Sequence, residues 1–168
     1  MLDRADREFG GILVSLADWP IVLTEFPEKR VADEALHAVL DHLEALLNEA
    51  ARIRQKLFFI TDLTLMREIT PASQRQYTGD WTRKVSGLSK AASVGSSTVT
   101  PSPILRGIIT AVFWIQPPPT PTSSVSTRHE AMLNGIAMLK AADALLPPRL
   151  LTYRDVKRSA GPSASGGR

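Results

Sequence analysis

The chain of 168 residues contains no cysteine. This absence excludes disulfide bonds, thiolate metal ligands and thiol nucleophiles, and it fits the reducing cytoplasm, where we expect the protein to be located. Residues 1–8 mix both signs of charge and lack the apolar core of a secretory signal, so we do not expect export. The most apolar run covers residues 104–115 and includes Arg106, whereas a membrane-spanning helix needs about 20 apolar residues. We therefore predict no transmembrane segment.

Sequence motifs of common catalytic and nucleotide-binding sites are also missing. The chain has no Gly-x-Ser-x-Gly elbow, no Gly-x-Gly-x-x-Gly fingerprint and no phosphate-binding Walker loop, and no nucleophile is paired with a base. His37 and His42 are five residues apart on an expected helix, so they point away from each other instead of forming a metal pair. We expect both, and His129, on helix surfaces. The sequence predicts no catalytic residue, no metal site and no cofactor, and we expect a protein that is not an enzyme.

Hydrophobic residues make up 43% of the chain and charged residues 22%, which favours one globular domain over disorder. The net charge is +3, but the residues after 146 contain five of the 20 basic residues and a single acidic one. We predict a polar lead at 1–9, an α/β domain at 10–146 and a basic, disordered tail rich in Pro, Gly and Ser at 147–168. Because no nucleic-acid-reading motif is present, we expect no specific nucleic-acid binding, and weak anion or nucleic-acid contacts through the tail alone.

The first half of the chain predicts a hairpin followed by a βαβ unit. Two β-rich runs, 12–16 and 21–26, are separated by a turn at 17–20. Apolar residues then recur at steps of three and four, which predicts an amphipathic helix over about 32–51. A short apolar run at 56–62 is typical of an interior strand that follows a crossover helix.

The second half continues this alternation. Thr70 is expected to cap a helix that has Pro71 in its first turn and extends to Leu88. A strand within 91–99, an apolar helix at 104–115, a short edge strand at 123–126 and a final helix capped by Thr127 complete the expected order. We therefore predict an α/β fold with a single mixed β-sheet of about four or five strands and about four helices. The sheet begins with the N-terminal hairpin and continues as parallel βαβ units.

Four segments carry a family resemblance. They are residues 19–24, 58–62, 71–75 with Trp81 downstream, and 105–114 followed by three prolines at 117–119. In pattern and order, the region 10–146 resembles the SpoIIAA-like, STAS-related small proteins, which are distantly similar to CRAL-TRIO lipid-transfer domains. The resemblance implies a sheet whose strands alternate with helices. It also implies a binding function, directed at a partner protein in the STAS case or at a nonpolar small molecule in the lipid-carrier case.

The resemblance also implies a phosphorylation site. In STAS anti-sigma antagonists a phosphorylatable hydroxyl lies at the start of the helix after the third strand, which places a phospho-switch at Thr70 or Ser73. The Asp-Ser-Ser/Thr-Gly signature of that site is replaced here by residues 68–73. The residues themselves also support simpler roles, because a threonine before a proline is a common helix cap and Ser73 would be an exposed serine of the first turn.

A strand-end loop is the second candidate site. Residues 62–64 resemble the strand-end motif of the family, with Asp62 and Thr64 as its polar members. Ligands of open α/β sheets gather at the carboxyl ends of strands, where Asp62 is expected. Asp62 would serve there in loop hydrogen bonding or, together with Glu68, as one of two carboxylates.

The third candidate is the apolar segment 104–115, which is apolar on nearly every face and therefore needs a cover on both sides. Packing of one face on the sheet leaves an apolar interface or ligand surface made of Leu105, Ile109, Phe113 and Trp114. The cover would be the final helix of the chain, a second subunit or a nonpolar ligand. Arg106 would contact an anionic group or pair with a local carboxylate.

These observations predict a noncatalytic, STAS-like protein-interaction or regulatory module that self-associates through 104–115. Its expected partner is another protein or a second copy of the chain. The alternative is a small carrier that binds a lipophilic molecule, and both predictions depend on the same apolar segment.

Overall fold

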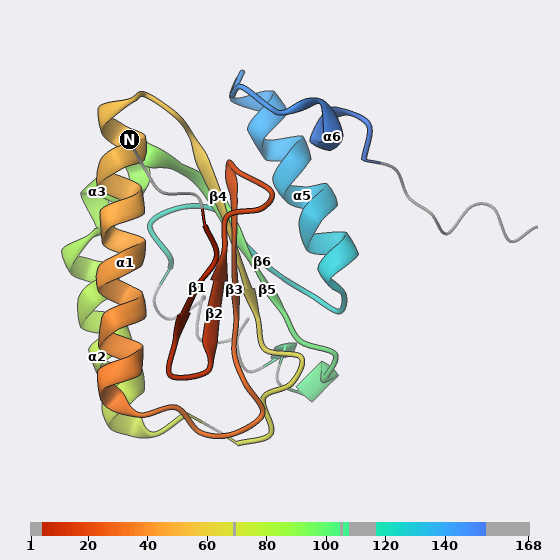
Figure 1. Ribbon diagram of the computed structural model, residues 1–168. Helices are drawn as coiled ribbons and strands as arrows, with labels where there is room; N and C mark the ends of the chain where they lie inside the picture. Colours follow the sequence, from red (N-terminus) through yellow and green to blue (C-terminus); the bar gives the residue numbers. More distant parts are fainter. Residues whose placement is uncertain (1–4, 69, 105, 108–116, 154–168) are drawn as a thin grey trace, which may run out of the picture.

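Six strands form one mixed β-sheet that separates two layers of helices (Figure 1). The computed structural model describes residues 5–68, 70–104, 106–107 and 117–153. The strands lie in the sheet in their order along the chain, as β1 (Arg7–Phe9), β2 (Ile12–Ser15), β3 (Ile21–Glu25), β4 (Leu57–Asp62), β5 (Ser93–Val99) and β6 (Thr122–Val125). β1 to β3 pair antiparallel and β3 to β6 pair parallel. The α/β class and the single mixed sheet agree with the prediction, although four or five strands were expected.

Helices cover both faces of this sheet. One layer contains α1 (Asp33–Arg52), α2 (Ala72–Lys84) and α3 (Ser86–Ala92), and the other contains α5 (Arg128–Ala141) and α6 (Pro148–Leu151) (Figure 1). α1 lies within one residue of the predicted range 32–51 because its buried residues recur every three or four positions. They are Leu36, Val39, Leu40, Leu46, Leu47 and Ala50. Among the residues described, no helix combines the length and the apolar character needed to cross a membrane.

The sixth strand, β1, comes from the region that we predicted to be a polar lead. Gly10 and Gly11 have φ values of +55° and +92°, which favour glycine, and they form the two-residue turn between Phe9 and Ile12. Phe9 contacts the ring of His42 in α1, with 5.3 Å between ring centroids. His42 Nε2 is buried and has no hydrogen-bond partner among the described residues. The sheet therefore begins at β1, and the predicted surface position of His42 is wrong.

The start of α2 differs from the prediction. Pro71 is the N-cap, with φ −54° and ψ 152°, and no side chain caps the helix by a hydrogen bond. Because Pro71 is extended, the helix begins at Ala72 and Thr70 lies outside it, so the predicted N-cap role of Thr70 is wrong. The helix predicted up to Leu88 is also divided at Val85, whose φ of −90° and ψ of 6° separate α2 from α3.

The later elements agree with their predicted positions. β5 and β6 lie within one or two residues of the predicted strands, and β6 is an edge strand as expected. Thr127 caps α5, since its hydroxyl accepts a hydrogen bond from Glu130 N at 3.2 Å. Thr127 N in turn donates to the Glu130 carboxylate, which completes a capping box.

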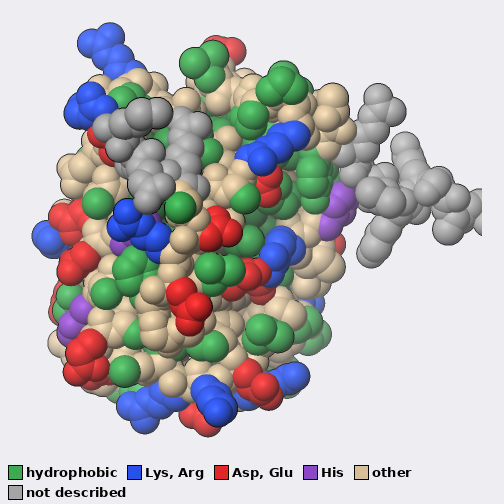
Figure 2. All heavy atoms as spheres, viewed as in Figure 1, with side chains coloured by type: hydrophobic (Ala, Val, Ile, Leu, Met, Phe, Trp, Pro, Cys, Tyr) green, Lys and Arg blue, Asp and Glu red, His purple; other side chains and the backbone are tan. Residues whose placement is uncertain are grey.

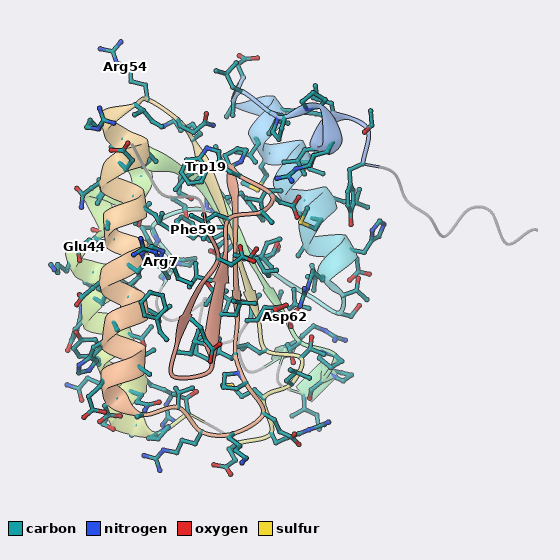
Figure 3. The ribbon with its side chains drawn as sticks, in the orientation of Figure 1. Arg7, Trp19, Glu44, Arg54, Phe59 and Asp62 are labelled. Carbon is teal, nitrogen blue, oxygen red and sulfur yellow. The ribbon has the colours of Figure 1, made fainter. Side chains whose placement is uncertain are left out.

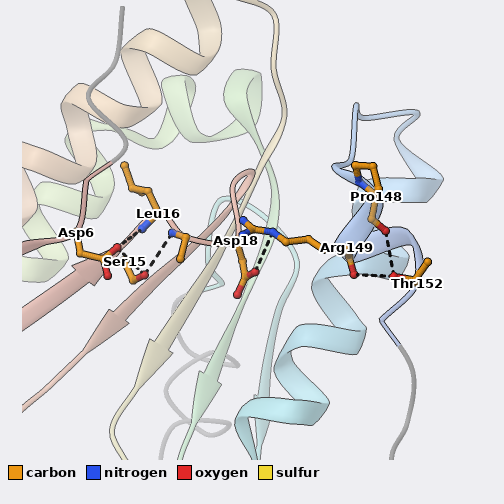
Figure 4. A network of polar contacts seen from close by, with 8 residues as sticks. Asp6, Ser15, Leu16, Asp18, Pro148, Arg149 and Thr152 are labelled. Atoms are coloured by element: carbon orange, nitrogen blue, oxygen red, sulfur yellow. Dashed lines mark hydrogen bonds and ion pairs between the residues drawn. The ribbon is translucent and has the colours of Figure 1, made fainter.

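The packed structure continues past residue 146, where we predicted that the domain ends. Leu150 of α6 is 1% exposed in the core on the α5 side of the sheet. Arg149 Nε lies 3.4 Å from Asp18 Oδ1 in the turn between β2 and β3 (Figure 4). Burial of a leucine side chain contributes about 2 kcal/mol, which explains why this segment packs on the sheet. The predicted disorder is therefore wrong for 147–153, and residues 154–168 lie outside the described residues.

Alternation of side chains along the parallel strands produces two apolar cores, one on each face of the sheet. In β4, Leu57 and Phe59 pack on the α1 side, whereas Phe58 and Ile60 pack on the α5 side. The core on the α5 side depends on Gly135 of α5, because a Cβ there would lie 2.5 Å from Phe58 Cδ1. The glycine thus lets α5 approach the sheet closely.

We predict that Gly135→Ala lowers the free energy of unfolding by about 1–2 kcal/mol, because the clash with buried Phe58 outweighs the higher helix propensity of alanine. Gly79→Ala in α2 is the matched control, since a Cβ there meets no atom within 4 Å. It should raise the free energy of unfolding by up to about 1 kcal/mol. Urea denaturation of both variants measures the two changes, and equal effects would show that Gly135 is not needed for close approach.

Candidate ligand-binding cavity

A cavity of about 540 Å³ lies between α1, α2 and the carboxyl ends of β3 and β4. In Figure 1 this region is at the lower end of the sheet, where the loops after β3 and β4 lead into α1 and α2. The wall is mainly apolar. Its members include Phe26, Val31, Leu36, Val39, Leu40 and Trp81.

The sheet places two threonines in this cavity. Thr24 of β3 and Thr61 of β4 are direct neighbours in the parallel register, and both line the cavity. Thr24 is 4% exposed, and neither hydroxyl hydrogen-bonds to another of the described residues. Buried polar groups normally have hydrogen-bond partners. These two hydroxyls are therefore available to a group that occupies the cavity.

The cavity exists because α2 packs against α1 and α3 more than against the sheet. The residues of α2 that line the cavity include Gly79, which has no side chain, and the small residues Thr78 and Thr82. They leave space that larger residues would fill. Gln74, which is 3% exposed, holds this arrangement together. Its Nε2 donates to Val31 O at 3.1 Å and to Asp33 Oδ1 at 2.6 Å, which ties α2 to the start of α1.

Charged side chains surround the cavity on its exposed side. Lys29 and Arg30 lie in the loop between β3 and α1, and Arg75 lies in the first turns of α2. Two carboxylates, Glu28 and Glu68, also line the cavity. Over the face drawn in Figure 2, basic and acidic side chains are interspersed, with no broad patch of one sign.

A cluster of ions lies on the opposite face of the sheet. Glu25 and Asp62 follow the two threonines in the sequence, so they face α5 and are neighbours in the register. Arg128, the first residue of α5, donates from Nε and Nη2 to Asp62 Oδ2 at 2.9 and 2.7 Å, and it also forms an ion pair with Glu25. Figure 3 labels Asp62 near the lower end of the sheet. The cluster joins the carboxyl ends of β3 and β4 to the start of α5.

The pKa values of Asp62 and Arg128 are both shifted in this cluster. Burial acts to raise the pKa of Asp62, but hydrogen bonds from Thr64 and Arg128 outweigh it and hold the pKa below its usual value. Burial likewise acts to lower the pKa of Arg128, and the carboxylates of Asp62 and Glu25 raise it above its usual value. The charged forms of Asp62 and Arg128 are therefore favoured in the folded protein.

The structure separates the residues that the sequence analysis grouped at the strand end. Asp62 Oδ1 accepts a hydrogen bond from Thr64 N at 2.9 Å, which is a loop hydrogen bond of the expected kind. Glu68 lines the cavity on the α1 side, whereas Asp62 faces α5, so they do not form a pair of carboxylates. Thr70 lines the cavity and its carbonyl oxygen accepts from Arg75 Nη1, whereas Ser73 is exposed on α2.

The predicted apolar surface of Leu105, Ile109, Phe113 and Trp114 lies outside the described residues. Arg106 is described, and its Nη1 donates to Thr100 O at 2.8 Å and to Pro101 O at 3.0 Å. Part of its guanidinium is therefore used to hold the loop after β5.

Sequence reasoning missed the threonine floor of the cavity and the partner of Asp62. Arg128 is 66 residues from Asp62, so no local spacing relates the two. A cation in the first turn of a helix is unfavourable to the helix dipole, and this was a usable sign that Arg128 has an acidic partner. Threonines at the same position in two neighbouring apolar strands were a comparable sign of a polar spot on the sheet.

We predict that Asp62→Asn destabilises the protein by about 2 kcal/mol at neutral pH, because it removes the charged acceptor of Arg128. The folded-state pKa of Asp62 is lower than its unfolded value of about 3.9, so this stabilisation is present above that pH and is lost as the pH falls through the folded pKa. Asp80→Asn, which breaks an exposed pair with Arg83, is the control and should have a much smaller effect. Denaturant unfolding at pH 7 and pH 3 tests this, and a pH-independent difference would contradict it.

No protein-family model matches the chain, and no curated protein or solved structure matches it either. The resemblance to the SpoIIAA-like and STAS-related proteins therefore stays a prediction based on its sequence segments. The geometry adds two features that do not depend on that resemblance. They are an apolar cavity with two threonine hydroxyls on its floor, and an ion cluster on the other side of the sheet.

Proposed function

We propose that this chain is a noncatalytic binding module that takes up a nonpolar small molecule in the cavity between α1 and α2. The observation that carries the proposal is the cavity itself, whose volume of about 540 Å³ lies within the range of about 300–1,000 Å³ typical of small-molecule sites. Its apolar wall supports a nonpolar ligand. Its position at the carboxyl ends of two parallel strands is where ligands of open α/β sheets bind.

Apolar burial supplies most of the binding free energy in such a cavity. Burial of apolar surface contributes about 25 cal/mol per Å², so a ligand that loses about 200 Å² to the wall gains about 5 kcal/mol before the entropic cost of association. Two hydroxyls, of Thr24 and Thr61, add hydrogen-bonding capacity at the floor. We therefore expect affinity for molecules with a hydrocarbon body and few polar atoms.

This proposal takes up the carrier alternative of the sequence analysis. We also propose that the chain is related to the SpoIIAA-like, STAS-related proteins. A nonpolar ligand fits the distant similarity of these proteins to lipid-transfer domains. A phospho-switch at Thr70 or Ser73 and a cytoplasmic location stay predictions. Of these two residues, Thr70 lines the cavity, so its phosphorylation is the one that would affect ligand binding.

A fluorescent competition assay tests ligand binding. N-phenylnaphthylamine, a neutral nonpolar probe, should bind saturably and should be displaced by dodecanol. Val39→Phe places an aromatic ring at the cavity wall and should weaken probe binding about tenfold. Val125→Phe makes the same change on the α5 side of the sheet and should leave binding unchanged. If both variants bind the probe like the parent protein, the ligand does not occupy this cavity.

Self-association through 104–115 remains a second proposal. Ile104 supports it, because this large apolar side chain is 78% exposed at the start of that segment. Sedimentation analysis should then show a dimer at micromolar concentration, and Ile109→Asp should shift it to a monomer by placing a charge in the apolar interface. A parent protein that is a monomer throughout this concentration range would contradict the proposal.

A further inference from the structure

Basic side chains outnumber acidic ones beside the cavity, and two of the basic side chains have no acidic partner among the described residues. Lys29 and Arg30 make no hydrogen bond or ion pair with any described residue. Glu28, between them and the strand, lies 3.6 Å from Arg67 Nε and is thus offset by a cation outside the lining. Of the residues that line the cavity, three are basic, Lys29, Arg30 and Arg75, and two are acidic, Glu28 and Glu68.

This local excess of basic residues does not reflect the charge of the domain. Residues 1–146 contain 15 basic and 16 acidic residues, so the domain that holds the cavity is close to neutral. The cationic excess at the cavity therefore contrasts with its surroundings. Unpaired cations next to an apolar cavity are the arrangement that an amphiphile with an anionic head would match.

From this juxtaposition, we infer that the ligand is an anionic amphiphile, a carboxylic acid with a hydrocarbon chain. Its chain would lie between α1 and α2, and its carboxylate would lie at Lys29 and Arg30. The inference rests on the proposed function, because it names the class of molecule that the same cavity takes.

The interior of the cavity determines the direction in which the acid enters. The interior polar groups without a partner among the described residues are all neutral: the hydroxyls of Thr24 and Thr61 and the indole Nε1–H of Trp81. The amide of Gln74 is already bonded to Val31 and Asp33. A carboxylate placed there would be buried without a cation, which is costly. The carboxylate therefore stays at the exposed side, where Lys29 and Arg30 lie and water still reaches it.

Comparison of an acid with its alcohol separates the head from the chain. Dodecanoic acid and dodecanol have the same hydrocarbon chain. Each would be titrated at neutral pH against N-phenylnaphthylamine that is bound to the protein. We expect the acid to bind about fivefold more tightly, which is the effect of one partly exposed ion pair. Added salt should reduce this preference and leave the alcohol unchanged.

Two double variants test where the carboxylate of the bound acid lies. Lys29→Gln/Arg30→Gln should remove the preference for the acid, measured as the ratio of the affinities for dodecanoic acid and dodecanol. Arg54→Gln/Lys90→Gln makes an equal change of charge at exposed residues that do not line the cavity, and it should retain the preference. Figure 3 labels Arg54 at the end of α1 far from the cavity.

The outcomes distinguish this inference from the proposed function. If the acid and the alcohol bind the parent protein equally, the inference of an anionic ligand is overturned, whereas the proposed binding of a nonpolar molecule is retained. If the preference survives in Lys29→Gln/Arg30→Gln, the head does not lie at these residues and the inference is overturned. If neither molecule displaces the probe, the proposed function fails and this inference fails with it.

Discussion

The register between β3 and β4 is the constraint on which both sides of the sheet depend. It places Thr24 beside Thr61 and Glu25 beside Asp62. A shift of β4 by one residue would turn Asp62 into the apolar cavity and Thr61 toward α5. An unpaired carboxylate in an apolar environment costs several kcal/mol, so the ion cluster with Arg128 favours the observed register. The same register therefore keeps the cavity nonpolar.

The two helical layers differ in how closely they approach the sheet. α5 approaches closely, because Gly135 lies against Phe58 and Arg128 binds the strand ends. α2 is held by Gln74 to the start of α1, and its small side chains leave a cavity. The α5 side is therefore packed closely on the sheet, whereas the α1 side retains the cavity that we propose for a ligand.

Sequence reasoning predicted the elements whose periodicity is local, such as α1, β4 and the capped start of α5. It failed where a backbone conformation decides, as at Gly10 and Gly11, which add β1, and at Pro71, which delays the start of α2. Asp62 was predicted as a strand-end group, but its partner Arg128 depends on a long-range contact. The cavity was not predicted, because it arises from how α2 packs and not from any motif.

The most direct test of the cavity is a methyl NMR titration with dodecanol. Binding between α1 and α2 predicts chemical-shift changes at the methyl groups of Thr24, Thr61 and Val39, all of which line the cavity. The methyl groups of Ile136 and Leu139, on the α5 side, should not change. Changes confined to the α5 side, or none at any concentration at which dodecanol is dissolved, would contradict a ligand site between these helices.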